Sequence, residues 1–120
     1  MERGHEWDAV PPGSVLTVKL TLSKKTVVAG TIIVERPDGS QRARINAGHF
    51  RSPLKVSIAA GATHEVKFAV MHTGETVKYA IDARLAGPDG KLFGEAVSCA
   101  DELTADRPVF TMKLVANAAS

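Results

Sequence analysis

The sequence predicts a single all-β domain, an antiparallel, immunoglobulin-like β-sandwich of seven or eight strands. Apolar and polar residues alternate through most of the chain, which is typical of strands that bury one face. Turn-forming residues recur about every ten residues, and no segment carries the full apolar stripe of an amphipathic helix. The length of 120 residues fits one domain with its own core.

Eight segments are expected to form strands. Alternation predicts them over residues 16–22, 28–34, 43–47, 54–58, 66–70, 77–85, 91–97 and 110–114. The third segment is short and is interrupted at Gly48. Turns are predicted at 37–39 and, most strongly, at 87–90, because proline presets φ and glycine accepts positive φ. Residues 101–107 are expected to form a polar loop, and 23–28 and 101–106 are the two places where a short helix would fit.

Both ends of the chain lack a strand pattern. Residues 1–10 show no periodicity and are expected to form a flexible N-terminal tail, and residues 117–120 a small polar C-terminal tail. The sandwich domain is therefore placed at residues 11–116. Trp7 is unexpected in such a tail, and we expect it to fold back over the end of the sandwich.

Composition excludes several classes of protein. Fifteen basic and thirteen acidic residues give a net charge of +2, which is too balanced to predict a nucleic-acid-binding protein. No apolar run approaches the roughly 20 residues of a membrane-spanning helix. Cys99 is the single cysteine, so no intramolecular disulfide can form, and we expect it to be a half-buried apolar side chain. The chain begins without an apolar signal segment, which favours either a cytosolic protein or one whose targeting segment has been removed.

The sequence predicts no enzyme and no cofactor. Its four histidines lack the spacing of a metal site and are expected in loops or on the surface; they are His5, His49, His64 and His72. No nucleophile elbow and no glycine-rich phosphate loop is present. Asp82 and Arg84 project from one face of a strand and are expected to form an ordinary surface ion pair. We therefore predict no catalytic, cofactor-binding or metal-binding residues.

Interaction surfaces remain as the functional feature of such a domain. A sandwich offers edge strands and grooves to a partner. Four apolar residues are candidate exposed anchors, although each is more often a core residue; they are Trp7, Phe50, Met71 and Phe93. The residues that bind a partner are not identified by the sequence.

Three stretches, residues 10–20, 79–93 and 52–56, carry a family resemblance. Val10-Pro11-Pro12-Gly13-Ser14-Val15-Leu16-Thr17-Val18-Lys19-Leu20 is similar to the turn and first strand of the YscW/YbaY-type lipoprotein domain. Tyr79-Ala80-Ile81-Asp82-Ala83-Arg84-Leu85 and Asp89-Gly90-Lys91-Leu92-Phe93 resemble its Tyr-x-x-x-Ala-Arg-Ile strand and Asp-Gly-Lys-Leu hairpin. Ser52-Pro53-Leu54-Lys55-Val56 corresponds to its Pro-Phe-x-Phe strand, with aliphatic residues in place of the aromatic pair. Order and spacing agree over about residues 10–98.

The resemblance implies a type III secretion pilotin, a virulence-associated lipoprotein on the periplasmic face of the outer membrane. Such a protein binds the C-terminal segment of a secretin subunit and assists its outer-membrane targeting and assembly. The lipid-bearing cysteine of the family is missing here, and Cys99 cannot take its place, so the N-terminal lipid would lie outside this chain. A monomer without nucleic-acid partners is expected. Relatives of unknown role share the same motifs. The alternative is an immunoglobulin-like extracellular module that binds a protein or a carbohydrate.

Overall fold

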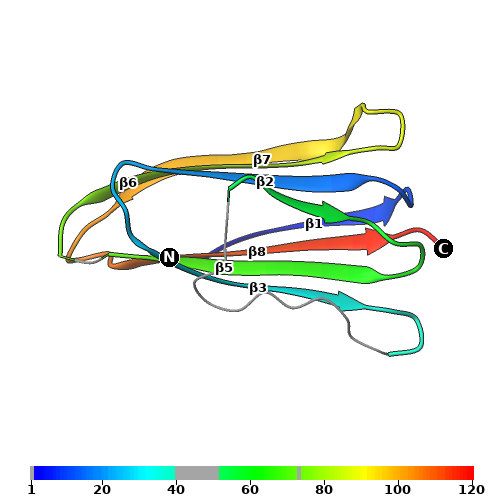
Figure 1. Cartoon of the computed structure of the whole chain (residues 1–120), viewed down its shortest axis with the longest axis horizontal. Helices are drawn as coiled ribbons and strands as arrows, with labels where there is room; N and C mark the ends of the chain where they lie inside the picture. The colour runs from blue at the N-terminus through cyan, green and yellow to red at the C-terminus, as the bar shows by residue number, and fades with distance from the viewer. Residues whose placement is uncertain (1, 40–51, 73) are drawn as a thin grey trace.

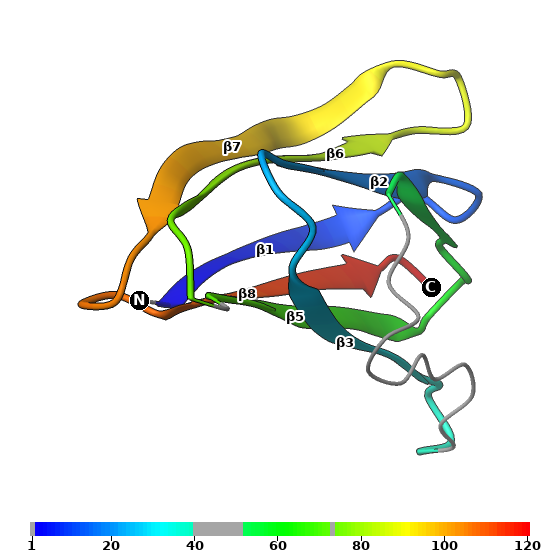
Figure 2. The same cartoon turned by 60° about the vertical axis from the view of Figure 1, so that its left-hand side comes forward.

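The computed structural model describes residues 2–39, 52–72 and 74–120. Eight strands form two four-stranded sheets that pack face to face, with the orders β1-β8-β5-β3 and β4-β2-β6-β7 (Figures 1 and 2). The strands are β1 (Glu2–Val10), β2 (Val15–Leu22), β3 (Val27–Glu35), β4 (Leu54–Ser57), β5 (Thr63–Met71), β6 (Val77–Ala86), β7 (Leu92–Leu103) and β8 (Val109–Ala118). The predicted all-β sandwich is confirmed, and none of the described residues is helical.

The core lies between the two sheets and follows the alternation of the sequence. On β2 and β6, apolar residues face inward in register, so that Leu16 lies opposite Leu85 and both side chains are fully buried. The other sheet contributes the inward side chains of β5 and β8. Tyr79 of one sheet packs against Phe110 of the other, with 4.7 Å between ring centroids. Each fully buried large apolar side chain contributes roughly 1.5–3 kcal/mol.

The N-terminal segment differs from the prediction of a flexible tail. Residues 2–10 form β1, which pairs in parallel with β8, whereas the other five strand pairs described are antiparallel. Arg3, His5 and Trp7 share the face of β1 that turns toward the core, but Arg3 is exposed, His5 is half-buried and only Trp7 is fully buried. The strand therefore shows no apolar alternation in the sequence.

Trp7 attaches β1 to the opposite sheet. Its side chain is 3% exposed, and it meets the His5 ring edge-to-face at 4.6 Å. The indole N–H donates to the Glu95 carbonyl oxygen on β7 at 3.0 Å. Trp7 is thus a core residue that joins the two sheets. Its buried indole N–H has a hydrogen-bond partner, as is usual for buried tryptophan.

The C-terminal segment also differs from the prediction of a tail. β8 continues to Ala118. Beyond it, the Ala119 N–H donates to the Val10 carbonyl at 2.8 Å, and the Ala119 carbonyl accepts the Gly61 N–H at 2.9 Å. These bonds tie the chain end to the end of β1 and to the turn before β5. The sequence does not predict the end of β8 because its residues 116–118 are alanine and asparagine, which have low strand propensity.

β7 is longer than predicted. The sequence places a strand at 91–97 and a loop at 101–107, but β7 runs without a break from Val97 to Leu103 along β6. The register shifts between Ala83 and Leu85 of β6, opposite the positive-φ Gly94. Neither segment considered for a short helix is helical. The predicted turns at 37–39 and 87–90 are confirmed, whereas the strand expected at 43–47 lies outside the described residues.

Candidate functional site

The three stretches that carry the family resemblance fold into one sheet. Residues 10–20 contribute β2, residues 79–93 contribute β6 and the start of β7, and residues 52–56 contribute β4. β2 pairs with β6 from Val15 to Leu22, and with β4 from Val15 to Val18. Segments far apart in the sequence therefore share the sheet β4-β2-β6-β7.

A row of small side chains crosses this outer face. Thr21 lies opposite Ala80, and Ala80 lies opposite Ala100, so the row spans β2, β6 and β7. Alternation on β6 buries Tyr79 and Ile81 and turns Ala80 outward. The two alanines are both exposed, and their short side chains leave the sheet surface low between longer neighbours.

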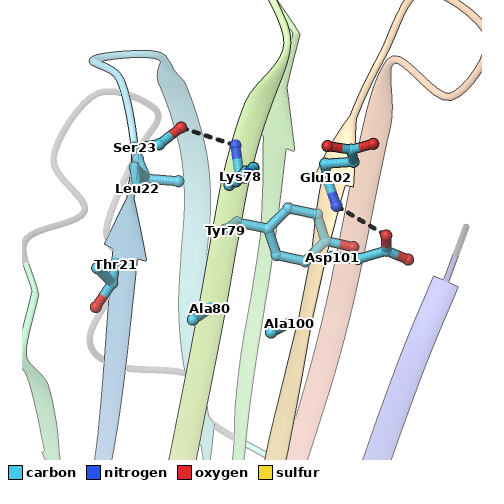
Figure 3. A pocket seen from close by; sticks show the side chains of 9 residues that line it. All are labelled: Thr21, Leu22, Ser23, Lys78, Tyr79, Ala80, Ala100, Asp101 and Glu102. Carbon is cyan, nitrogen blue, oxygen red and sulfur yellow. Dashed lines mark hydrogen bonds between the residues drawn. The ribbon is translucent and has the colours of Figure 1, made fainter.

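The small row opens into a depression of about 570 Å³. Nine residues line it (Figure 3); they are Thr21, Leu22, Ser23, Lys78, Tyr79, Ala80, Ala100, Asp101 and Glu102. A second hollow of about 440 Å³ continues over the same two alanines toward Asp82 and Ser98. These volumes lie in the range of ligand-binding sites, roughly 300–1,000 Å³. The depression is open to solvent on the outer face of the sheet.

Hydrogen bonds from backbone N–H groups hold the polar rim of the depression. Ser23 Oγ accepts the Lys78 N–H at 2.8 Å, and the Lys78 carbonyl accepts the Ser23 N–H at 2.9 Å, so the end of β2 is clamped to β6 (Figure 3). Asp101 Oδ1 accepts the Glu102 N–H at 2.8 Å. Burial, and then the charge of Asp101, raises the pKa of Tyr79, so its hydroxyl stays protonated at neutral pH. These hydrogen bonds hold the charged lining residues Lys78, Asp101 and Glu102 at the edge of the depression.

Asp82 and Arg84 form the surface pair that the sequence predicts. Arg84 Nε donates to Asp82 Oδ1 at 2.7 Å and Nη2 donates to Oδ2 at 2.8 Å, while Ser98 Oγ donates to Oδ2 at 3.2 Å. The hydrogen bonds from Arg84 hold the pKa of Asp82 below its ordinary value. The pair stands beside the second hollow. Its geometry is that of a structural ion pair on a solvated sheet face.

The histidines do not come together. His5 contacts Trp7, His72 follows β5, and His49 lies outside the described residues. His64 corrects the expectation of surface histidines, because it is 0% exposed. In the described part of the chain, no three histidine, cysteine or acidic side chains gather as a metal site.

His64 is held by two backbone groups. Its Nε2 accepts the Ala59 N–H at 3.1 Å, and its Nδ1 lies 3.3 Å from the Ala116 carbonyl oxygen. Since a carbonyl only accepts, Nδ1 carries the proton and the ring is neutral. Burial lowers the pKa of His64. This histidine therefore has a structural place in the fold.

Cys99 and the three remaining candidate anchors, Phe50, Met71 and Phe93, are spread over the sequence. Cys99 is half-buried on the inner side of β7, as expected, and burial raises the pKa of its thiol. Phe93 is half-buried at the start of β7, and Phe50 lies outside the described residues. Met71 lies on the outer face of the other sheet, between Val27 and Val109, which are 51% and 39% exposed. This apolar row is the second surface feature of the molecule.

Sequence reasoning missed the depression itself. The available signal was an outward alanine on each of two strands, but only the pairing register shows that Ala80 and Ala100 are neighbours. The described residues include no helix that is long and apolar enough to cross a membrane. Comparison with models of protein families, with curated proteins and with solved structures finds no match.

Proposed function

We propose that this protein is a pilotin-like lipoprotein of a type III secretion system, which binds the C-terminal segment of a secretin subunit and assists its targeting to, and assembly in, the outer membrane. It would act at the periplasmic face of that membrane, held by an N-terminal lipid outside this chain. One observation carries the proposal. The three stretches that resemble the YscW/YbaY-type domain form the single sheet that bears the depression at Ala80 and Ala100.

The chemistry of the depression supports a peptide as its occupant. Its centre consists of small side chains, which let a partner's backbone or a narrow helix face come close, and its rim carries Lys78 and Glu102. An apolar centre with a polar rim is the usual anatomy of a protein-binding patch. In the described part of the chain, no aromatic side chain is exposed on this face, which favours a peptide over the carbohydrate of the alternative hypothesis.

The position of the depression supports a membrane-anchored role. β1 begins at the end of the sandwich where β2 ends and β6 starts, which is also the end that carries the depression (Figure 1). Arg3 near the start of β1 is close enough to Tyr79 to lower its pKa slightly against the effect of burial. A lipid attached upstream of β1 would therefore hold the depression toward the membrane in which the secretin assembles.

The proposal is tested with a synthetic peptide of the C-terminal segment of the type III secretin from the same organism. Isothermal titration calorimetry should give a micromolar Kd for the unaltered protein. Ala80→Gln fills the depression and should weaken binding at least tenfold, about 1.4 kcal/mol. Ala69→Gln is the matched control, because Ala69 also faces outward from a central strand, but on the other sheet.

Two outcomes would contradict the proposal. One is the absence of binding by the unaltered protein at about 100 µM peptide, a concentration well above the expected micromolar Kd. The other is an equal loss of affinity in both variants, which would locate binding elsewhere. The lipid anchor is tested separately by the native coding sequence upstream of this chain, which should encode a signal peptide ending in a lipobox cysteine. A native gene that encodes neither would contradict the lipoprotein role and leave the extracellular binding module as the better hypothesis.

A further inference from the structure

We infer that β7 is a docking edge, along which an extended, basic segment of the partner protein adds a further strand to the sheet β4-β2-β6-β7. The inference rests on the proposed function and specifies how the partner segment binds. β7 is the longest strand described, with twelve residues. β6 is its neighbour in the sheet, and β7 forms the outermost edge in both views (Figures 1 and 2).

The edge of β7 is regular where a partner strand would pair. Its register with β6 continues without a bulge from Val97 to Leu103. In an antiparallel edge strand, every second residue directs its N–H and C=O away from its neighbour. The Glu102 N–H is bonded to the Asp101 side chain of its own strand, which indicates that Glu102 faces the free edge. Alternation then directs the backbone groups of Ser98 and Ala100 outward as well.

The stretch of β7 from Val97 to Leu103 lacks the lysine, proline or bulge that blocks strand addition at many edges. Natural edge strands are protected by lysine, proline, bulges or shortness. β4 has only four residues, and β1 carries a bulge between Trp7 and Val10 with Ala9 at a φ of 51°. From Leu92 to Leu103, by contrast, β7 has no lysine, arginine or proline. β1 approaches β7 through the Trp7 contact at Glu95 and through Arg3, whose charge reaches Cys99. Beyond Glu95, the residues Ser98, Ala100 and Glu102 are exposed.

The charge on β7 identifies the kind of segment. The strand carries Glu95, Asp101 and Glu102, a charge of −3 within a chain of net charge +2. Asp101 has Arg107 at 3.7 Å as a counter-ion, and the ion pairs of the described residues include neither of the two glutamates. Lysine or arginine at alternate positions of an added strand would meet this acidic edge, and the attraction would raise the association rate.

The side chains of β7 leave room for those of an added strand. On the outer face, Ser98 and Ala100 are small and border the depression, so an apolar side chain of the partner fits beside them. On the inner side, Val97 and Cys99 are half-buried, and a partner side chain would complete their burial. Backbone pairing supplies affinity and these two faces supply specificity, as in other cases of strand addition.

Hydrogen exchange measured by mass spectrometry tests the inference with the same secretin peptide and the full chain. Bound peptide should slow exchange at the edge amides of β7, between residues 96 and 102, by at least tenfold. Ala100→Pro removes an outward N–H and should weaken binding at least tenfold. Ala105→Pro, at an exposed position in the loop after β7, is the matched control and should bind like the unaltered protein. Glu102→Gln should slow association several-fold at low salt, whereas Glu65→Gln on the other sheet should not.

The outcomes separate this inference from the proposed function. Peptide binding without protection of β7, or with protection of β3 instead, would overturn the docking edge and leave the binding function standing. No peptide binding at all would overturn both. If Ala100→Pro fails to fold, a peptide methylated on alternate backbone nitrogens replaces it. That peptide should bind at least tenfold more weakly than the unmethylated one, and equal affinity would overturn the inference.

Discussion

Protonation of His64 should destabilise the fold at mildly acidic pH. The neutral ring donates from Nδ1 to Ala116 and accepts at Nε2 from Ala59. A second proton has to occupy Nε2, where it would face the Ala59 N–H, so a hydrogen bond becomes a contact between two donors. The ring is fully buried, which adds the cost of an unsolvated charge. Both effects favour the neutral form, and the pKa of His64 is accordingly lowered in the folded protein.

The sign and size of the effect follow from proton linkage. The unfolded chain takes up a proton as pH falls below about 6.5, while folded His64 stays neutral, so unfolding becomes more favourable. The free energy of unfolding should therefore fall by up to about 1.4 kcal/mol per pH unit below pH 6.5, until the folded pKa is reached. Between pH 7.5 and 5.0 this contribution is at most about 2 kcal/mol. The stability is present at neutral pH and is lost on acidification.

Urea unfolding, followed by the fluorescence of the single tryptophan, measures the effect at intervals between pH 7.5 and 5.0. His64→Gln removes the titrating ring but keeps a donor and an acceptor, so its unfolding free energy should depend less steeply on pH than that of the unaltered protein. His72→Gln is the reference for the loss of one histidine. Equal slopes in the unaltered protein and in His64→Gln would refute the reasoning.

Two further substitutions test the packing and the surface pair. Gly94→Ala should destabilise the fold by about 2 kcal/mol, because its Cβ would lie 3.0 Å from Trp7 Cδ1 at a φ of +66°. Gly90→Ala has positive φ but no atom within 4 Å, so it should cost only about 1 kcal/mol; equal values in urea unfolding would contradict the Trp7 contact. Arg84→Ala should raise the pKa of Asp82 toward its ordinary value in an NMR titration of the carboxyl, and an unchanged pKa would contradict the observed pair.

The alternation of apolar residues predicted most of the sandwich. Strands such as β2 and β6 bury one face of a sheet, so their period of two is visible in the sequence. β1 was missed because Arg3 and His5 occupy inward positions at the edge of the sheet. The end of β8 was missed because its residues are mostly alanine. In both segments, pairing with neighbours decides the structure, and such pairing is not a local property of the sequence.

The candidate site could not be predicted from the sequence for a similar reason. A low row on a sheet arises when small residues on different strands fall into register, and register is fixed by tertiary pairing. Ala80 and Ala100 lie twenty positions apart and each is unremarkable alone. The burial of His64 was likewise unpredictable. Its hydrogen-bond donor, Ala59, lies in the turn before β5, and its acceptor, Ala116, lies in β8. The Asp82–Arg84 pair was predictable because residues two apart on a strand share a face.

The most direct test of the proposed function is a ¹⁵N NMR titration of the full chain with the secretin C-terminal peptide. Chemical-shift changes should concentrate on β2, β6 and β7, centred on Thr21, Ala80 and Ala100. Changes centred instead on the apolar row of Val27, Met71 and Val109 would move the binding surface to the other sheet and contradict the proposed site. A spectrum unchanged at saturating peptide would contradict the pilotin function itself.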